Sequence, residues 1–146
     1  MLVDGKNLTT IWFEEINDTV KIIDQRLLPH ELKIVNLNNF SEAVFAIKEM
    51  QVRGAPLIGV TASFAMYLAS KENPEISSLK NSGKQLKQTR PTAVNLAWAV
   101  DKIMDNIINI DKNNRPKKIL QMANKIRWRK NFQYTIYNNG YRVSFK

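Results

Sequence analysis

One long segment of the chain is apolar on every side of a helix. Between residues 55 and 70 only Thr61, Ser63 and Tyr67 interrupt the apolar pattern, and residues 57–69 carry no charge. A helix that is apolar all round is buried, because no face of it prefers water. The pattern therefore predicts a central helix against which the other elements pack.

Other segments have apolar residues three or four positions apart, as expected for a helix that buries one face. The first covers residues 40–50, with Ser41 as its expected N-cap and an end near Val52. The clearest covers residues 93–108, where charged and amide side chains fall on the opposite side. Two weaker helical segments follow the same rule: residues 77–88 and 117–126.

The first 36 residues have a strand pattern instead. Residues 10–13 and 19–24 are rich in β-branched and aromatic side chains, and Asn17-Asp18 between them is a turn signal, which predicts a hairpin. Residues 31–36 are expected to form a third strand. The predicted fold class is α+β: a small antiparallel three-stranded sheet followed by a helical bundle.

Two arginines stand where apolar helices are expected to open. Arg53-Gly54-Ala55-Pro56 is expected to open the central helix, and Arg90-Pro91-Thr92 to open the helix that continues through residues 93–108. Each proline is expected in the first turn, where its missing N–H would have had no partner. Free amides and the helix dipole attract anions at such openings, and a guanidinium matches phosphate geometry. The two openings are hypothesised to hold a phosphorylated small molecule. The alternative is that each arginine only caps a solvated helix end.

The composition removes several classes of chemistry. The chain has no cysteine, so neither disulfides nor thiolate chemistry is available to it. Neither metal-ligand spacing nor a glycine-rich nucleotide-binding motif occurs, so no metal or cofactor is expected. His30, the sole histidine, has no carboxylate partner nearby in sequence and is interpreted as structural or solvent-facing. No apolar run is long enough for a membrane span, which favours a cytoplasmic location.

Several motifs resemble those of the S-methyl-5-thioribose-1-phosphate isomerase family. They are Thr10-Ile11-Trp12, Ile23-Asp24-Gln25, Leu28-Pro29-His30-Glu31, Val52 to Gly59 and Thr89 to Leu96. They occur in the family's order, across residues 8–126, and cover only its amino-terminal domain. The resemblance places Arg53, Gly54, Ala55 and Arg90 at sugar-phosphate-binding positions in a cleft between two domains.

The resemblance also implies what this sequence does not carry. Members of the family convert 5-methylthioribose 1-phosphate to 5-methylthioribulose 1-phosphate in methionine salvage, without a cofactor and as homodimers. Their catalytic cysteine and aspartate lie in a second, Rossmann-like carboxy-terminal domain. This chain is expected to end before that domain, as a truncated gene product, and therefore to have no catalytic residue and no activity by itself.

The charge of the chain changes abruptly near its end. Residues 1–111 carry 12 basic and 13 acidic side chains, whereas residues 112–146 carry 10 basic and no acidic ones. We therefore divide the chain into an amino-terminal domain, residues 1–126, and a basic tail that does not match the family, residues 127–146. The tail is interpreted either as the product of a shifted reading frame, the favoured explanation, or as an arm that binds nucleic acid through interleaved aromatic and basic residues.

Three other functions stay open at this point. A non-catalytic regulatory or binding module is one, because regulatory subunits of the initiation-factor nucleotide-exchange complex share the family's fold. A ribose-1,5-bisphosphate isomerase is another, because it uses similar segments. Nucleic-acid binding by the tail is the third, and it predicts an affinity that falls steeply with salt.

Overall fold

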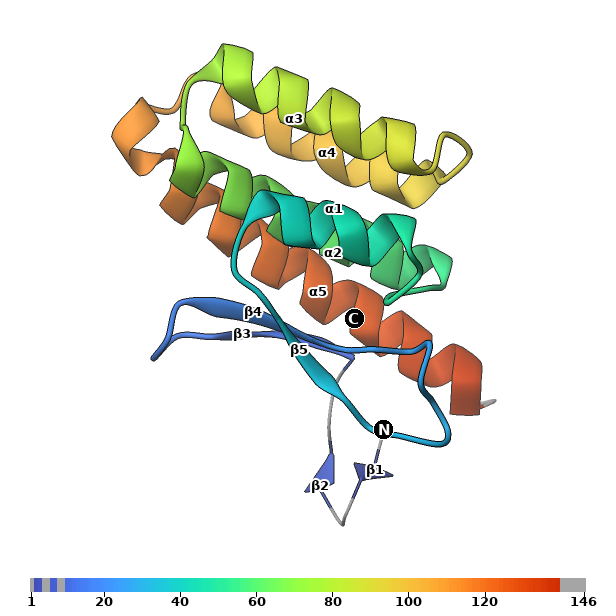
Figure 1. Ribbon diagram of the computed structural model, residues 1–146. Coiled ribbons are helices and arrows are strands. Elements are labelled where there is room, and N and C mark those ends of the chain that lie inside the picture. Colours follow the sequence, from blue (N-terminus) through green and yellow to red (C-terminus); the bar gives the residue numbers. More distant parts are fainter. Residues whose placement is uncertain (1, 4–5, 8–9, 140–146) are drawn as a thin grey trace.

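The computed structural model describes the backbone of residues 2–3, 6–7 and 10–139 and the side chains of residues 10–127. Five helices lie above a small antiparallel sheet (Figure 1). The expected α+β fold, a three-stranded sheet followed by a helical bundle, is confirmed. The strands and helices of the described chain are β1 (Leu2–Val3), β2 (Lys6–Asn7), β3 (Ile11–Glu14), β4 (Thr19–Ile23), β5 (Ile34–Leu37), α1 (Phe40–Lys48), α2 (Ala55–Glu72), α3 (Ile76–Thr89), α4 (Val94–Ile107) and α5 (Arg115–Asn139), with a short 3-10 turn at Lys112–Asn114.

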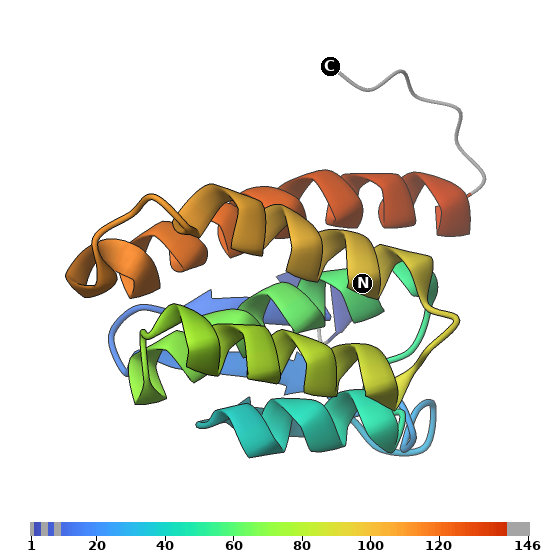
Figure 2. The same ribbon diagram turned by 90° about the horizontal axis from the view of Figure 1, so that it is seen from above.

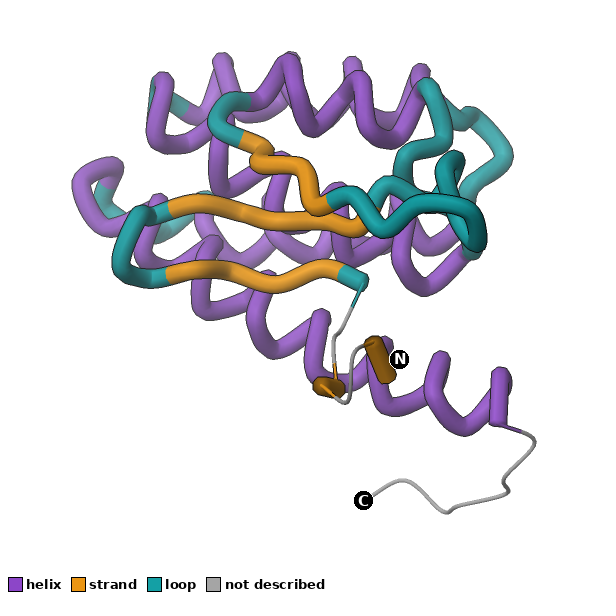
Figure 3. Tube along the Cα trace, turned by 60° about the horizontal axis from the view of Figure 1, so that its bottom comes forward, coloured by secondary structure: helices purple, strands orange, loops and turns teal. Residues whose placement is uncertain are grey.

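The main sheet has the strand order β3-β4-β5, and both pairs are antiparallel (Figure 3). Glu14 pairs with Thr19 at the expected hairpin, and Asp18 adopts a positive φ of 49° in the turn. Val20 and Ile22 belong to the apolar core while Lys21 between them is half-buried, so the face that carries Val20 and Ile22 packs on the helices. The paired strands β1 and β2 were not predicted from the sequence.

The third strand begins later than expected. Residues 31–36 were predicted, but β5 covers Ile34–Leu37. The Glu31 amide donates to the Leu27 carbonyl at 3.0 Å, so the chain is still turning there, after a cis bond between Leu28 and Pro29. Pairing with β4 begins where Ile34 lies opposite Ile23.

The start and end of α1 also differ from the prediction. Asn39, not Ser41, is the N-cap, and its side-chain oxygen accepts a hydrogen bond from the Glu42 amide at 2.9 Å. The helix ends at Lys48, four residues before the expected end near Val52. Met50 takes a positive φ of 61°, which ends the helix.

Helix α2 is the centre of the molecule, as predicted. It contacts each of the other four helices, and every residue from Leu57 to Ser70 is buried. The buried hydroxyls of Thr61 and Ser63 donate to the carbonyls of Leu57 and Gly59 four positions earlier, so polar side chains cost little inside the core. In Figure 2, seen from above, α2 lies between α5 and α4 on one side and α3 and α1 on the other.

Helix α5 continues past the expected end of the amino-terminal domain. It runs without a break from Arg115 to Asn139, across the proposed boundary at residue 126. Residues 140–146, and the aromatic side chains of the tail from Trp128 onward, lie outside the described residues. The origin and role of the basic tail therefore stay predictions. In the part of the chain that is described, no helix is at once long and apolar enough for a membrane span.

Candidate functional site

The opening of α2 leaves backbone donors free of side-chain caps. Gly54 is the N-cap, with a φ of 95° that L-residues rarely adopt, and as a glycine it has no side chain to accept a hydrogen bond from the helix amides. The first hydrogen bond of the helix runs from the Ile58 amide to the Gly54 carbonyl at 3.0 Å. The amides of Ala55 and Leu57 precede it, and Pro56 between them has no donor to leave unpaired. The positive end of the helix dipole lies here.

The opening of α4 differs from the prediction in one respect. Arg90 is the C-cap of α3, and a turn closed by the Ala93 amide and the Arg90 carbonyl at 3.0 Å separates it from α4. Pro91 lies in this turn and not in the first turn of the helix, which begins at Val94. The N-cap of α4 is Ala93, whose methyl side chain cannot accept a hydrogen bond from the amides of the first turn.

The two openings lie at the same end of the bundle. In Figures 1 and 2 the loops that lead into α2 and α4 both lie at the right-hand end. The contact between Gly59 and Asn95 explains why the helices can start so close together: a Cβ on Gly59 would lie 3.1 Å from the Asn95 carbonyl oxygen. Because Gly59 has no side chain, the first half of α2 can approach the start of α4 closely.

The two arginines have different surroundings at this end. Arg53 is exposed, and no carboxylate of residues 10–127 forms an ion pair with it. Arg90 is half-buried, and its Nε donates to the carbonyl oxygen of Ile47 at 3.3 Å, which ties the end of α3 to the end of α1. That the four residues Arg53, Gly54, Ala55 and Arg90 bind a phosphate stays a prediction, now with the two helix starts at one end of the fold.

The chemistry of these groups is that of binding. A guanidinium stays protonated at any physiological pH, and backbone amides only donate hydrogen bonds. These groups can neutralise and orient an anion, but none of them can accept a proton from a sugar carbon. His30 lies exposed in the loop before β5, as expected. In the described part of the chain, no three carboxylate or histidine side chains gather as a metal site.

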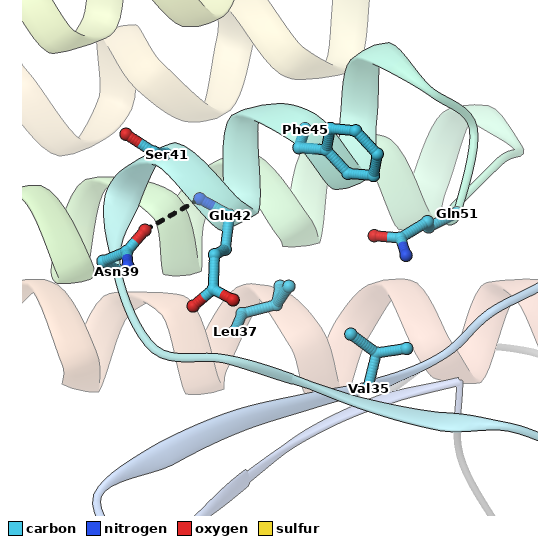
Figure 4. A pocket seen from close by; sticks show the side chains of 7 residues that line it. All are labelled: Val35, Leu37, Asn39, Ser41, Glu42, Phe45 and Gln51. Atoms are coloured by element: carbon cyan, nitrogen blue, oxygen red, sulfur yellow. Dashed lines mark hydrogen bonds between the residues drawn. The ribbon is translucent and has the colours of Figure 1, made fainter.

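A hollow lies between β5 and α1. It is an open groove of about 400 Å³ with the apolar side chains of Val35, Leu37 and Phe45 along it and the amide of Gln51 near one end (Figure 4). None of the four candidate residues lines it. Half of the Phe45 side chain is exposed there, and the Arg26 guanidinium lies 5.9 Å from its ring centre.

The sequence reasoning missed a buried polar pair that joins the loop before α2 to the end of β4. Asp24 and Gln51 are both buried, and the Gln51 side chain donates to the Asp24 carboxylate at 3.2 Å. Asp24 was noted only within the motif Ile23-Asp24-Gln25, with no role given to it. A carboxylate placed directly after a buried strand was the available signal, because such a group needs a partner.

Comparison with known proteins places this fold in a family. The sequence profile of the Initiation factor 2 subunit family matches residues 51–140, which include both helix openings. The chain belongs to the Initiation factor 2 subunit family. Within it, the chain is 50% identical over 103 residues to a methylthioribose-1-phosphate isomerase from Methylocella silvestris, and 41% identical over 126 residues to one from Rhizobium meliloti.

Solved structures of family members have the same fold. The 5-methylthioribose 1-phosphate isomerase from Pyrococcus horikoshii superposes with a TM-score of 0.75 at 34% identity, over 83% of this chain and 36% of that one. Subunit delta of the translation initiation factor eIF-2B from A. fulgidus superposes with a TM-score of 0.72 at 28% identity, over 84% of this chain and 37% of that one. The chain covers 70% and 86% of its own length in the two sequence matches, but spans only 28% and 35% of those relatives.

Proposed function

We propose that this chain is the sugar-phosphate-holding domain of a methylthioribose-1-phosphate isomerase-like protein. The observation that carries the proposal is the placement of two uncapped helix starts, each with an arginine in the loop before it, at one end of the bundle. The isomerase relatives at 50% and 41% identity support this substrate class. A phosphate there accepts hydrogen bonds from the α2 amides, and the guanidinium groups of Arg53 and Arg90 neutralise its negative charge.

The chain alone is proposed not to convert its ligand. Isomerisation of an aldose 1-phosphate to a ketose moves a hydrogen between the first two carbons, and a general base and acid must reach both of them. The groups at the two helix openings are protonated guanidinium and amide donors, which do neither. The sequence has no cysteine to take such a role. Binding without turnover is the expected behaviour.

Calorimetric titration of the 146-residue chain with 5-methylthioribose 1-phosphate tests the binding. We expect affinity that requires the phosphate, so that unphosphorylated 5-methylthioribose does not compete. Arg53→Ala should weaken binding about tenfold or more, since a charge-assisted hydrogen bond is worth about 1.5–3 kcal/mol. Arg90→Lys keeps the charge but loses the planar fork, so a smaller loss is expected.

The matched control is Lys48→Ala, which removes an exposed cation from the last turn of α1, at the same end of the fold. It should change the affinity by less than about twofold, because an exposed charge outside the site acts only through screened solvent. Equal losses in the Lys48 and Arg53 variants would contradict the proposed site. Ketose formation above background by the purified chain would contradict the proposed lack of turnover.

A second candidate function is that of a non-catalytic regulatory module. The superposition on subunit delta of a translation initiation factor favours it, together with a site made only of donors. This alternative predicts that the chain binds a sugar phosphate but does not form an active isomerase with a catalytic domain. Adding the part of an isomerase relative that this chain does not match separates the two: ketose formation by the mixture supports the isomerase, and its absence supports the module.

A further inference from the structure

The loop between α1 and α2 is hydrogen-bonded to the end of β4, a segment 27 residues earlier in the chain. The side-chain Nε2 of Gln51 donates to Oδ2 of Asp24 at 3.2 Å, and the backbone amide of Gln25 donates to the Gln51 carbonyl at 2.9 Å. Gln51 lies two residues before Arg53 and three before the Gly54 N-cap. Side chain and backbone of one loop residue are thus both anchored to the sheet.

Asp24 is itself a fixed acceptor. The Arg26 side chain donates to both of its oxygens, at 3.0 and 2.9 Å, and the Arg26 amide donates to Oδ1 at 3.1 Å. Only 2% of the Asp24 side chain is exposed. These hydrogen bonds from Arg26, helped by the one from Gln51, outweigh the cost of burial and hold the pKa of Asp24 below its ordinary value. Because Arg26 holds the ionised Asp24 carboxylate in place, the Gln51 side chain that is bonded to this carboxylate has little freedom to move.

The same loop is held from the helices as well. The Val52 amide donates to the Ala46 carbonyl at 3.3 Å. Two residues of the loop have positive φ, 61° at Met50 and 95° at Gly54, so the chain reverses sharply on both sides of Gln51. A non-glycine residue persists in that region only where its surroundings hold it. The bonds to Asp24 and Gln25 lie between these two reversals and fix the path of the chain toward Arg53.

We propose that Asp24 and Gln51 are positioning residues for the anion-binding start of α2. The inference rests on the proposed function, because it supposes that Arg53 and the amides of Ala55 and Leu57 hold a phosphate. Neither Asp24 nor Gln51 is required to touch that phosphate. Their part is to keep the loop in place, and a binding group displaced by an ångström loses much of its effect.

The direction in which one substitution changes the phosphate affinity distinguishes a positioning role from a simple effect of charge. Asp24→Asn removes a negative charge near a site for anions, so electrostatics alone predicts tighter phosphate binding. Positioning predicts the opposite. We expect phosphate affinity, followed by NMR titration with inorganic phosphate, to fall about fivefold in Asp24→Asn and in Gln51→Ala, the second of which changes no charge.

The matched control is Asp101→Asn. Asp101 forms an exposed ion pair with Lys87 at 2.6 Å, on α4 and away from the loop, so this variant makes the same change in charge and also breaks a pair. Its phosphate affinity should stay the same or rise slightly. Should Asp24→Asn fail to fold, Gln51→Ala carries the test alone, since it leaves the Asp24–Arg26 pair intact.

A second readout needs no ligand. The amides of Gln25 and Val52 are hydrogen-bonded in this connection, so their hydrogen exchange should quicken in both variants while that of Phe64, in the middle of α2, does not change. Unchanged exchange at Gln25 and Val52, or phosphate binding as tight as before in both variants, overturns the positioning role while leaving the anion site intact. If the unsubstituted chain does not bind phosphate, the anion site itself fails, and the positioning role with it.

Discussion

The hydroxyl of Tyr67, in the second half of α2, donates to Oδ1 of Asp18 in the hairpin turn at 2.6 Å. Lys71, one turn further along α2, donates to the other oxygen of the same carboxylate. The Tyr67 ring also meets Phe13 of β3 edge to face, with ring centres 5.7 Å apart. This contact joins the central helix to the β3–β4 hairpin, and it makes the turn residue Asp18 part of the packing between the two layers.

Tyr67→Phe should destabilise the fold by about 1–2 kcal/mol, because it removes a part-buried hydrogen bond to a charged acceptor while the ring and its contact with Phe13 remain. Urea unfolding followed by circular dichroism measures the change. The exposed pair of Asp101 and Lys87 is the comparison: Asp101→Asn is expected to cost less than about 0.5 kcal/mol. Equal losses of stability in the two variants would show that the Tyr67 hydrogen bond contributes no more than an ordinary surface ion pair.

Stability should fall in acid. Hydrogen bonds from Arg26 lower the pKa of Asp24, and those from Lys71 and Tyr67 outweigh burial to lower the pKa of Asp18. A carboxyl whose pKa is lower in the folded chain binds protons less readily there than in the unfolded chain, where its pKa is about 3.9. Its stabilisation is therefore complete above about pH 5 and is lost as the pH falls through the lower, folded value.

Urea midpoints at pH 6, 4 and 3 should decrease in that order, and the decrease should be smaller in Asp18→Asn, which has one such carboxyl fewer. Midpoints that stay level down to pH 3 would refute the linkage. The Asp18 variant should already be less stable at pH 6, where the carboxylate is ionised and bonded to Lys71 and Tyr67.

Gly83 allows α3 and α4 to pack closely. A Cβ at this position would lie 2.7 Å from Cγ1 of Val100, closer than two carbons can approach. Gly83→Ala gains about 1 kcal/mol in helix propensity, but we expect the overlap to cost more and the variant to be less stable. Val100→Ala removes the overlapping methyl group. The double variant should therefore lose less stability than the two single losses added together, and simple additivity in thermal unfolding would contradict the predicted overlap.

Arg127 is a half-buried cation that forms no ion pair with a carboxylate of residues 10–127. Its Nη1 donates to the Ile11 carbonyl at 3.3 Å, its Nε is buried and has no hydrogen-bond partner among those residues, and burial lowers its pKa. Arg127→Met keeps the length of the side chain and removes the desolvated charge, so stability should rise by about 1 kcal/mol. Lys125→Met, an exposed position two residues earlier, is the control and should leave the urea midpoint nearly unchanged.

Local sequence patterns were enough to predict the elements that bury an apolar face. The uncharged run of α2 and the periodic spacing of α4 predicted both helices, because burial alone decides their faces. The N-cap of α1 was less certain in principle: Asn39 and Ser41 are both capping residue types, and only the turn out of β5 selects Asn39. The late start of β5 depends on the Leu27 to Glu31 turn, which a strand-like composition does not reveal.

The candidate site likewise contains some residues that the sequence could predict and others that it could not. Arg53 and Gly54 could be found from the sequence because a glycine and a proline mark the helix opening locally. The bond between Asp24 and Gln51 could not, since it joins segments 27 residues apart and depends on how the sheet packs against the α1–α2 loop. Pro91 was predicted to begin a helix, but the turn closed by the Ala93 amide delays α4 to Val94.

The burial of α2 from Leu57 to Ser70 has a consequence for how this fold unfolds. Because each of the other helices covers part of it, none of them can detach without exposing apolar surface along the central helix. Stepwise loss of single helices is therefore costly, and the described bundle is expected to unfold as one cooperative unit, with circular dichroism and tryptophan fluorescence reporting the same transition.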